Sequence, residues 1–398
     1  MYRIGQEEIN AVTNAISEKS FFKVNDKLQY VKQAEEKMMQ LMGTKHAIFM
    51  TSGHAALESA LIAAGIGPGD QVIVPAYTYI STALAVVAAG AIPVICDIDD
   101  TLTLDPKAFE AMITQNTKAV MPVHIQGFPC NMDEICAIAK KHNIVVIEDA
   151  CQADGGSYKG KRLGTIGDAG AYSFNFFKII SAGEGGGLVT NNRDIFENSL
   201  IYHDSAAVAY FGNQLEGFKA TSFCGREYRS NEVAGGILLG QLERLDGILA
   251  DLRKNKKAMM EKLAPYARFA PSNDIDGDCG TTLPLAFETE EEARRFASYE
   301  GVNCGLPIDT GKHVYTNWKC IMEKKGAFNP LMDPFKFVAN KDIVPDYNAD
   351  MCKKSLEILS KTVYVRIDPE WTEEKLEARA NALIAGLKAC CPPVFVMP

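Results

Sequence analysis

The stretch Ser173-Phe-Asn-Phe-Phe-Lys-Ile-Ile-Ser-Ala-Gly-Glu-Gly-Gly-Gly187 sets Lys178 among apolar side chains, just before a glycine-rich loop. This setting is unusual, because lysine is normally a solvated surface charge. Upstream, the apolar run 144–147 (Ile-Val-Val-Ile) ends in Glu148 and Asp149, and Asp149 lies 29 residues before Lys178. Such a run is typical of a strand buried on both faces of a parallel sheet. The sequence therefore predicts an acid at the end of a buried strand and a lysine on a later loop.

Asp149 and Lys178 are the residue types that pyridoxal phosphate requires. A lysine holds this cofactor as a Schiff base, and a carboxylate holds the protonated ring nitrogen, because the pyridinium ring is the electron sink of the reaction. Neither residue alone is specific, since an acid after a strand is usually a cap or turn residue. Together they indicate a pyridoxal phosphate site.

Short β-rich runs alternate with helical patterns between residues 46 and 191. The expected strands are 46–50, 71–74, 92–96, 119–123, 144–147, 170–174 and 187–190. The expected helices between them are 54–65, 78–90, 105–113 and 131–143. This alternation predicts an α/β fold with a mostly parallel central sheet covered on both faces. Ligands bind such sheets at the carboxyl ends of the strands, where Ser52, Tyr77, Asp149 and Ser173 are expected to meet.

The second half of the chain predicts a connecting helix and a smaller domain. Apolar residues recur at helical spacing over 230–263, with Gly235, Gly236 and Gly240 as weak points where a kink could form. The segment 265–278 is rich in Pro, Asn, Asp and Gly and predicts a boundary. Beyond it, strand patterns mix with a terminal helix over 373–387. We expect a large domain over 1–263 and a small C-terminal α+β domain over 264–398.

Composition narrows the class of protein. The 41 basic and 50 acidic residues give a net charge of −9 without a long basic run, which argues against nucleic acid as a partner. The 11 cysteines are odd in number and form no Cys-x-x-Cys pair, so we expect neither a metal site nor a disulfide framework. The amino terminus has no apolar signal core, and no apolar run is long enough to span a membrane. The sequence predicts a cytoplasmic protein without a membrane partner.

Five ordered motifs resemble those of the DegT-type sugar aminotransferases, which are pyridoxal phosphate enzymes with the aspartate aminotransferase fold (fold type I). The motifs are Thr51-Ser-Gly-His-Ala-Ala-Leu57, Val74-Pro-Ala-Tyr-Thr-Tyr-Ile-Ser81, Glu148-Asp-Ala-Cys-Gln-Ala153, Gly164-Thr-Ile-Gly-Asp-Ala-Gly170 and Ser173-Phe-x-x-x-Lys178-x-x-x-x-Gly-Glu-Gly-Gly186. The resemblance covers roughly residues 1–263. Within the family, the chain is more similar to enzymes that aminate an eight-carbon keto sugar acid than to nucleotide-sugar enzymes.

The resemblance assigns the cofactor contacts. Lys178 is the expected catalytic residue, and Asp149 is the expected partner of the ring nitrogen. Ser52, Gly53 and His54 lie where a strand meets a helix start, which binds phosphate through backbone N–H groups, although an ordinary helix cap is the alternative. The family also implies ring stacking by Tyr79, a ring-hydroxyl contact by Gln152 and a phosphate contact by Ser173. The alternatives are a core aromatic, a surface amide and a hydroxyl paired within its strand.

Two positions depart from the family pattern. His54 replaces a threonine, and Glu227 replaces an asparagine that the partner subunit donates to the phosphate. A carboxylate about 4 Å from phosphate would cost about 4 kcal/mol at an effective dielectric constant of 20. Glu227 is therefore expected to turn away, to be protonated, or to pair with Arg226 or His54, so that the two replacements compensate each other.

Other residues are expected to support the site or to bind the substrate. His124 follows a strand and is expected to buttress the site, with a satisfied core histidine as the alternative. His313 and Tyr315 belong to a polar and aromatic group suited to a hydroxylated ligand, although a surface turn is the alternative. Arg229, in the Glu227 motif, is a further candidate for substrate binding.

The resemblance implies a homodimeric aminotransferase with active sites shared between subunits. Glutamate or glutamine would donate the amino group, and an oxo or aldehyde sugar, or a similar polyol ketone, would accept it. Two alternatives stay open at this point. One is a different pyridoxal phosphate reaction, such as sugar dehydration, although the dehydratases of this family replace the lysine with histidine. The other is a non-catalytic sensor on the same fold.

Overall fold

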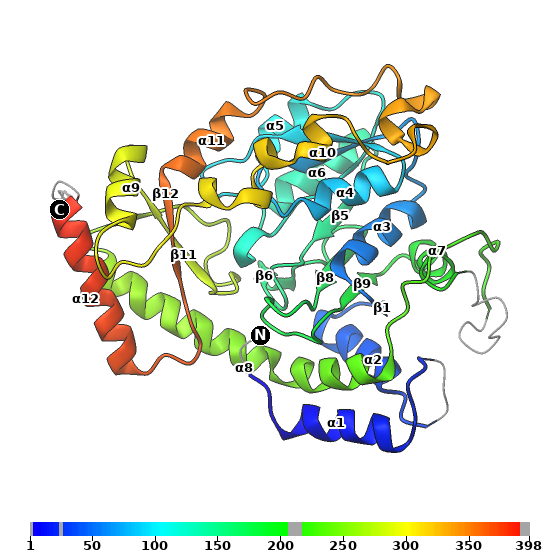
Figure 1. The fold of residues 1–398 in the computed structure, drawn as a ribbon, viewed down its shortest axis with the longest axis horizontal. Helices are drawn as coiled ribbons and strands as arrows, with labels where there is room; N and C mark the ends of the chain where they lie inside the picture. The colour runs from blue at the N-terminus through cyan, green and yellow to red at the C-terminus, as the bar shows by residue number, and fades with distance from the viewer. Residues whose placement is uncertain (1–2, 24–26, 206–216, 391–398) are drawn as a thin grey trace.

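The computed structural model describes residues 3–23, 27–205 and 217–390. A seven-stranded sheet lies at the centre, with the strand order β1-β9-β8-β5-β4-β2-β3 (Figure 1). Its strands are β1 (His46–Met50), β2 (Gln71–Pro75), β3 (Ile92–Cys96), β4 (Thr117–Val120), β5 (Val145–Asp149), β8 (Ala169–Ser173) and β9 (Gly186–Thr190). Strand β9 is antiparallel to β1 and β8, and the pairs among β3, β2, β4, β5 and β8 are parallel. The predicted mostly parallel α/β sheet is confirmed.

Side chains alternate between the two faces of the sheet, and each face has its own hydrophobic cluster. In β2, Ile73 belongs to the first cluster, whereas Val72 and Val74 belong to the second. The first cluster includes residues of helices α2 (Tyr30–Met42), α5 (Pro106–Ala111), α6 (Met132–His142) and α8 (Glu232–Leu263). The second includes residues of α3 (Gly53–Ala63), α4 (Ser81–Ala88) and α7 (Arg193–His203). Because helices cover both faces, a ligand can reach the sheet at its strand ends.

Helix α8 is a continuous helix of 32 residues that starts at the side-chain cap of Asn231. A Cβ atom on Gly235 would lie 2.7 Å from Val31 N, and one on Gly236 would lie 2.8 Å from Ala11 Cβ. These glycines therefore let α2 and the amino-terminal helix α1 (Gln6–Ser17) pack closely against α8. The close packing offsets their low helix propensity. The predicted connecting helix is present, without a break at the glycines.

The C-terminal region forms a second, smaller sheet. Strand β11 (Thr282–Ala286) pairs antiparallel with β10 (Arg268–Phe269) and with β12 (Thr362–Arg366). Helices α9 (Glu290–Ala297) and α12 (Glu373–Cys390) pack with this sheet beside the far end of α8 (Figure 1). This arrangement is the expected α+β type. The division of the chain at residues 263 and 264 stays a prediction.

The segment between β11 and β12 returns to the central sheet. The N–H of Tyr315 donates to Ala76 O at 3.0 Å, and the N–H of Thr78 donates to His313 O at 2.9 Å. Val314 and Trp318 join the second hydrophobic cluster. This segment includes α10 (Lys319–Met322), several single 3-10 turns and α11 (Lys353–Ser360). It brings residues from both halves of the chain to the same edge of the sheet.

Two short strands complete the structure, β6 (Ser157–Tyr158) and β7 (Lys161–Arg162), which pair as a small hairpin. Within the described ranges, no helix combines the length and hydrophobicity needed to cross a bilayer.

Candidate active site

Three strand ends and one helix start meet at the edge of the central sheet. Gly186, the first residue of β9, pairs with Met50 on one side and with Ser173 on the other. A Cβ atom on Gly186 would lie 2.1 Å from the Ser52 carbonyl oxygen. A Cβ atom on Gly53 would lie 2.9 Å from Ser173 Cβ. Both positions therefore require glycine for the backbone segments to approach each other this closely.

The start of α3 is the part of this edge that is suited to bind an anion. Ser52 is the N-cap residue, and its Oγ accepts the N–H of Ala55 at 3.1 Å. The first N–H groups of a helix have no acceptor within the helix, so those of Gly53 and His54 remain available to a ligand. The helix dipole adds positive potential at the same point. The structure thus shows Ser52 as a cap, the alternative expected from the sequence, at a helix start that can also hold a phosphate.

Asp149 lies at the end of β5 and is 4% exposed. Its Oδ2 accepts a hydrogen bond from Thr82 Oγ1 at 2.7 Å, and its Oδ1 accepts the N–H of Cys151 at 3.1 Å. Thr82 Oγ1 in turn lies 2.7 Å from Thr78 Oγ1. The Asp149 carboxylate is therefore oriented by Thr82, whose hydroxyl group is in turn hydrogen-bonded to that of Thr78. The role of Thr82 was not predicted from the sequence, although Thr82 lies in α4 (Ser81–Ala88), directly after the motif that ends at Ser81 and four residues after Thr78.

Lys178 lines a cavity of about 550 Å³ together with Gln152 and His313. The remaining lining residues are Gln126, Phe176, Phe177, Ile179, Thr281, Thr282, Tyr364 and Arg366. The backbone N–H of Lys178 donates to Asn175 O at 3.0 Å, in a turn that follows β8. The expected apolar surroundings of the lysine are only partly present. Ile179 is buried, but Phe176 and Phe177 are 56% and 83% exposed, because the strand ends at Ser173 and the turn carries both rings outward.

Electrostatics place the Lys178 ammonium group near the residues that follow Asp149. Burial raises the pKa of the Cys151 thiol and of the Asp154 carboxyl group well above their ordinary values, and the positive charge of Lys178 opposes the rise at both. Burial also lowers the pKa of His313, and the charges of Lys178 and Lys312 lower it further. Lys178 therefore lies within electrostatic range of the loop after β5 and of His313.

One wall of the cavity is a chain of polar contacts. Gln152 Oε1 accepts the N–H of Gln126 at 3.0 Å. Thr281 Oγ1 donates to Gln126 O at 2.6 Å, and Thr282 Oγ1 donates to Gln126 Oε1 at 3.1 Å. Gln126 has a left-handed backbone with φ of 53°, which turns this segment toward the small sheet. The Gln152 amide is thus held by its oxygen, and its NH₂ group keeps its donors for a ligand.

The aromatic residues divide between the cavity and the core. Tyr79 is 37% exposed, and its ring meets the edge of the His313 ring at a centroid distance of 5.5 Å. Tyr315, in contrast, is fully buried, and its hydroxyl donates to Ala349 O at 2.5 Å. The expectation of a substrate contact by Tyr315 is corrected, because the single 3-10 turn over residues 315–317 directs this side chain into the core.

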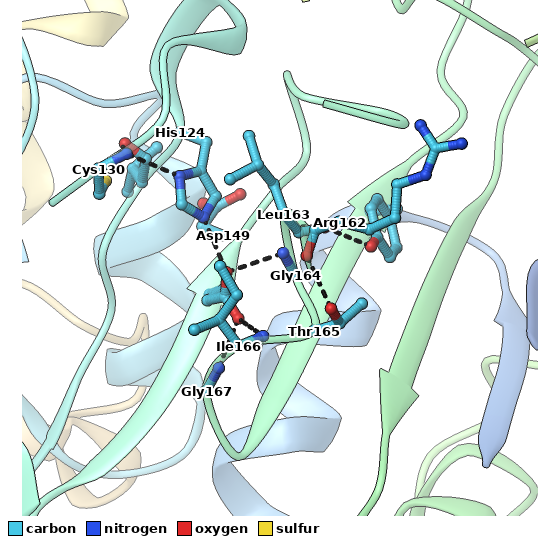
Figure 2. A network of polar contacts seen from close by, with 12 residues as sticks. His124, Cys130, Asp149, Arg162, Leu163, Gly164, Thr165, Ile166 and Gly167 are labelled. Atoms are coloured by element: carbon cyan, nitrogen blue, oxygen red, sulfur yellow. Dashed lines mark hydrogen bonds and ion pairs between the residues drawn. The ribbon is translucent and has the colours of Figure 1, made fainter. Parts of the chain in front are cut away.

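A buried network beneath the site supports the end of β5 (Figure 2). Glu148 Oε1 accepts the N–H groups of Ile166 and Gly167, both at 2.6 Å, and Oε2 accepts that of Gly164 at 2.8 Å. His124 Nδ1 accepts the N–H of Cys130 at 3.1 Å, so the ring proton lies on Nε2 and is donated to Glu148 Oε2 at 3.0 Å. His124 thus buttresses the site through Glu148, as a satisfied core histidine.

The expected compensation between His54 and Glu227 does not form within one chain. His54 Nε2 lies 3.6 Å from Glu58 Oε2, its neighbour one helical turn later. Glu227 Oε2 instead lies 2.7 Å from Arg229 Nη2. Arg229 also pairs with the buried Asp204. Within one chain, His54 and Glu227 therefore each pair with a residue close to them in the sequence. Arg229 is therefore already engaged by two carboxylates.

Glu58 is the buried centre of the group around His54. It accepts the hydroxyl groups of Tyr202 at 2.5 Å and of Tyr228 at 2.8 Å. Burial and these contacts with the carboxylate raise the pKa of Tyr202 to about 12. The group therefore connects α3 to α7 and to the Glu227 segment.

Comparison with known proteins identifies the family. A model of the DegT/DnrJ/EryC1/StrS aminotransferase family matches residues 2–295, which is more than half of the chain. The chain belongs to the DegT/DnrJ/EryC1/StrS aminotransferase family. The family resemblance that the five motifs indicated is confirmed.

Individual relatives of this aminotransferase family agree with that result. GDP-perosamine synthase of Caulobacter vibrioides is 42% identical over 223 residues, which is 56% of this chain and 58% of that protein. The chain spans about three fifths of the length of the curated relatives it matches. A solved aminotransferase from Psychrobacter cryohalolentis has a TM-score of 0.80 at 26% identity and covers 98% of this chain and 99% of its own.

The fold is also that of a neighbour with a different activity. GDP-4-keto-6-deoxy-D-mannose-3-dehydratase of Escherichia coli, solved with bound hydrated pyridoxal phosphate, has a TM-score of 0.77 at 22% identity. The likeness covers 96% of this chain and 98% of that chain. At this identity it shows the shared fold alone.

The residues at this edge fit pyridoxal phosphate. The start of α3 offers two N–H groups to a phosphate, Asp149 offers a fixed carboxylate to a ring nitrogen, and Lys178 offers an amine in the adjoining cavity. The glycines at 53 and 186 leave no room for side chains where the start of α3 meets β8 and β9. Within the described ranges, no group of three or more His, Cys, Asp or Glu side chains is arranged to hold a metal ion.

Proposed function

We propose that this protein is a pyridoxal phosphate-dependent aminotransferase. It moves an amino group from glutamate or glutamine to the carbonyl carbon of an oxo or aldehyde sugar, or of a similar polyol ketone. The observation that carries the proposal is the position of Lys178, in a cavity that adjoins the strand edge carrying Asp149 and the start of α3. Family membership supports the same reaction.

Each residue of the edge has a defined role in this proposal. The bound cofactor supplies an electron sink for the pair of electrons released at Cα of the amino donor. Lys178 Nζ would take the proton from that Cα atom and deliver it to the C4′ atom of the cofactor, as general base and then general acid. Asp149 holds the ring N–H, and Thr82 keeps the carboxylate in place. Gly53 and His54 bind the phosphate through their N–H groups, Gln152 binds the ring hydroxyl, and Tyr79 covers the ring.

We infer a homodimer in which the subunits share their active sites. Phe177, one residue before Lys178, is 83% exposed, and Phe176 is 56% exposed. Exposed aromatic rings beside a reactive lysine suit coverage by a second subunit, since aromatic residues are enriched in interface cores. Glu227 and Arg229 would then act from the neighbouring subunit, with their ion pair keeping the Glu227 carboxylate away from the phosphate. The free thiols of the described cysteines suit a cytoplasmic location.

The acceptor is proposed at the level of its chemistry. The wall formed by Gln126, Thr281 and Thr282 presents amide and hydroxyl groups, which suit the hydroxyl groups of a sugar. An eight-carbon keto sugar acid, the finer prediction of the sequence, is one member of this class.

Absorption spectroscopy tests the proposal. The purified protein is mixed with pyridoxal phosphate, and its spectrum is recorded before and after glutamate or glutamine is added. We expect a visible band of the lysine-bound cofactor that the amino donor bleaches. Lys178→Ala should not form this band, whereas Lys161→Ala, a change at an exposed lysine of β7, should form it normally.

The remaining outcomes decide between this function and the alternatives. A band that neither donor changes, combined with release of a dehydrated sugar, would identify a dehydratase. Absence of any cofactor binding by the wild-type protein would identify a non-catalytic protein on this fold.

A further inference from the structure

Arg366 differs from every other arginine in the part of the chain that the structure describes. Each of the others makes at least one ion pair or hydrogen bond through its guanidinium group. The guanidinium group of Arg366 makes neither with the residues that the structure describes, and its side chain is exposed. A planar cation with five N–H donors is therefore left open at one place in the fold.

That place is the cavity of Lys178. Arg366 is the last residue of β12 and pairs through the backbone with Thr282 of β11, and both residues line the cavity. The other polar residues of the lining are neutral near pH 7: Gln126, Gln152 and Thr281 do not ionise, burial lowers the pKa of His313, and burial raises the pKa of Tyr364. No aspartate or glutamate of the described residues lines this cavity. The cavity thus carries two positive side chains and no negative one, which favours a negatively charged ligand.

We propose that Arg366 anchors the carboxylate group of a substrate in the Lys178 cavity. The inference rests on the proposed transamination, because every amino acid donor carries a carboxylate next to the carbon atom that Lys178 deprotonates. An arginine fork matches a carboxylate through two parallel N–H···O bonds, which fixes orientation as well as charge. The carboxylate of a sugar acid acceptor has the same chemistry. Arg366 is therefore a specificity residue, separate from the residues that hold the cofactor.

Binding without turnover tests the anchor directly. Isothermal titration calorimetry with glutarate, an unreactive dicarboxylate, is carried out on the cofactor-loaded wild type, Arg366→Gln and Arg366→Lys. Loss of a charged hydrogen-bond pair predicts that Arg366→Gln weakens glutarate binding by about 10- to 100-fold. Arg366→Lys should recover only part of the affinity, because lysine keeps the charge but loses the fork. Arg268→Gln removes a charge from the same small sheet at an exposed pair with Glu288, and it should bind glutarate like the wild type.

Two further ligands show whether Arg366 binds the carboxylate of the amino donor or that of an acid acceptor. Glucuronate carries the carboxylate of a sugar acid, and glucose lacks it. If Arg366→Gln weakens glutarate binding and raises the glutamate concentration needed for half-maximal bleaching of the cofactor band, Arg366 anchors the donor. If it weakens only glucuronate binding, with glucose as the control, Arg366 anchors an acid acceptor.

Unchanged affinity of a folded Arg366→Gln protein for both acids would overturn the proposal. A fall in affinity for inorganic pyrophosphate alone would also overturn it, since the group would then recognise a phosphate. The proposed function fails separately, through absence of the Lys178-dependent cofactor band. Glutarate titration of the cofactor-free protein still tests Arg366 in that case.

Discussion

The candidate active site has two rims that were built in different ways. The rim from the large sheet holds Asp149, Ser173 and Lys178, which lie on or directly after neighbouring strands. The rim from the C-terminal region holds Thr282 and Arg366, which are far apart in the sequence and meet through antiparallel pairing of β11 and β12. The first rim is fixed by close backbone packing and satisfied hydrogen bonds. The second presents side chains with unused donors.

This difference separates chemistry from recognition. Two hydrogen bonds hold Asp149, and the backbone of Ser52 lies so close to Gly186 that no side chain fits there. The large-sheet rim therefore has little conformational freedom. The guanidinium group of Arg366 makes no ion pair or hydrogen bond with the described residues, so we propose that it can adapt to the substrate. We expect changes in the first rim to lower kcat and changes in the second to raise KM.

The largest expected effect comes from Lys178→Ala. The variant loses the group that we propose to move the proton at Cα of the donor, and loss of a general base predicts a fall in kcat of about 10³-fold. Single-turnover mixing of the cofactor-loaded variant with glutamate measures this rate. Lys161→Ala is the matched control. A variant that keeps most of the wild-type rate would remove Lys178 from the mechanism.

Asp149→Asn should have the next largest effect. Asparagine can still accept a hydrogen bond from Thr82, but it lacks the negative charge opposite the ring nitrogen. We expect kcat to fall by about 10²-fold with little change in KM, as for removal of one group that stabilises charge in a transition state. Steady-state kinetics check the prediction, with the exposed Asp133→Asn as control. A rise in KM at constant kcat would place Asp149 on the recognition side of the comparison.

Gly186→Ala tests the close packing of the large-sheet rim. The added Cβ atom would lie 2.1 Å from the Ser52 carbonyl, so the start of α3 must shift. We expect a loss of stability of about 1–3 kcal/mol or more, together with weaker cofactor binding. Gly247→Ala is the control, since it lies in α8 with no atom within 4 Å of the added group. It should stabilise the protein by about 1 kcal/mol. Urea unfolding measures the free energy of unfolding of both variants. Equal changes in the two variants would contradict the close packing at Gly186.

Asp154→Asn should affect catalysis least and the pH dependence of stability most. Both carboxyl oxygens of Asp154 are buried without a hydrogen-bond partner among the described residues, and burial raises the pKa well above 3.8. Between pH 3.8 and its raised pKa, the folded state keeps a proton that the unfolded state has released. The stability of the wild type therefore falls as pH rises through this window. The variant should lack this part of the slope, so its stability relative to the wild type should increase from pH 5 to pH 8. Identical slopes in urea unfolding would contradict the assignment.

Much of the large-sheet rim was predictable because its geometry is local. An apolar strand followed by Asp149 places the acid at the sheet edge whatever the rest of the chain does. Local pairs occupy the two departing residues within one chain. His54 pairs with Glu58 one helical turn later, and Glu227 pairs with Arg229 two residues later, so a contact between His54 and Glu227 of different subunits stays a prediction. These two pairs could have been found from their spacing.

The opposite rim could not be predicted in the same way. Nothing near Arg366 in the sequence indicates that it reaches the Lys178 cavity, because its position depends on the register between β11 and β12 and on the placement of the small sheet. Tyr315 shows the same limit, since a single 3-10 turn decides whether it enters the cavity or the core. Recognition residues on such segments are set by tertiary structure, while the catalytic edge follows from the order of the strands.

Reductive trapping at Lys178 tests the central claim most directly. The protein is incubated with pyridoxal phosphate, treated with sodium borohydride, digested and mapped by mass spectrometry. We predict a covalent pyridoxyl group on the peptide that contains Lys178, and its absence there when glutamate is added before the reductant. A label confined to exposed lysines, with the Lys178 peptide unmodified, would contradict the account.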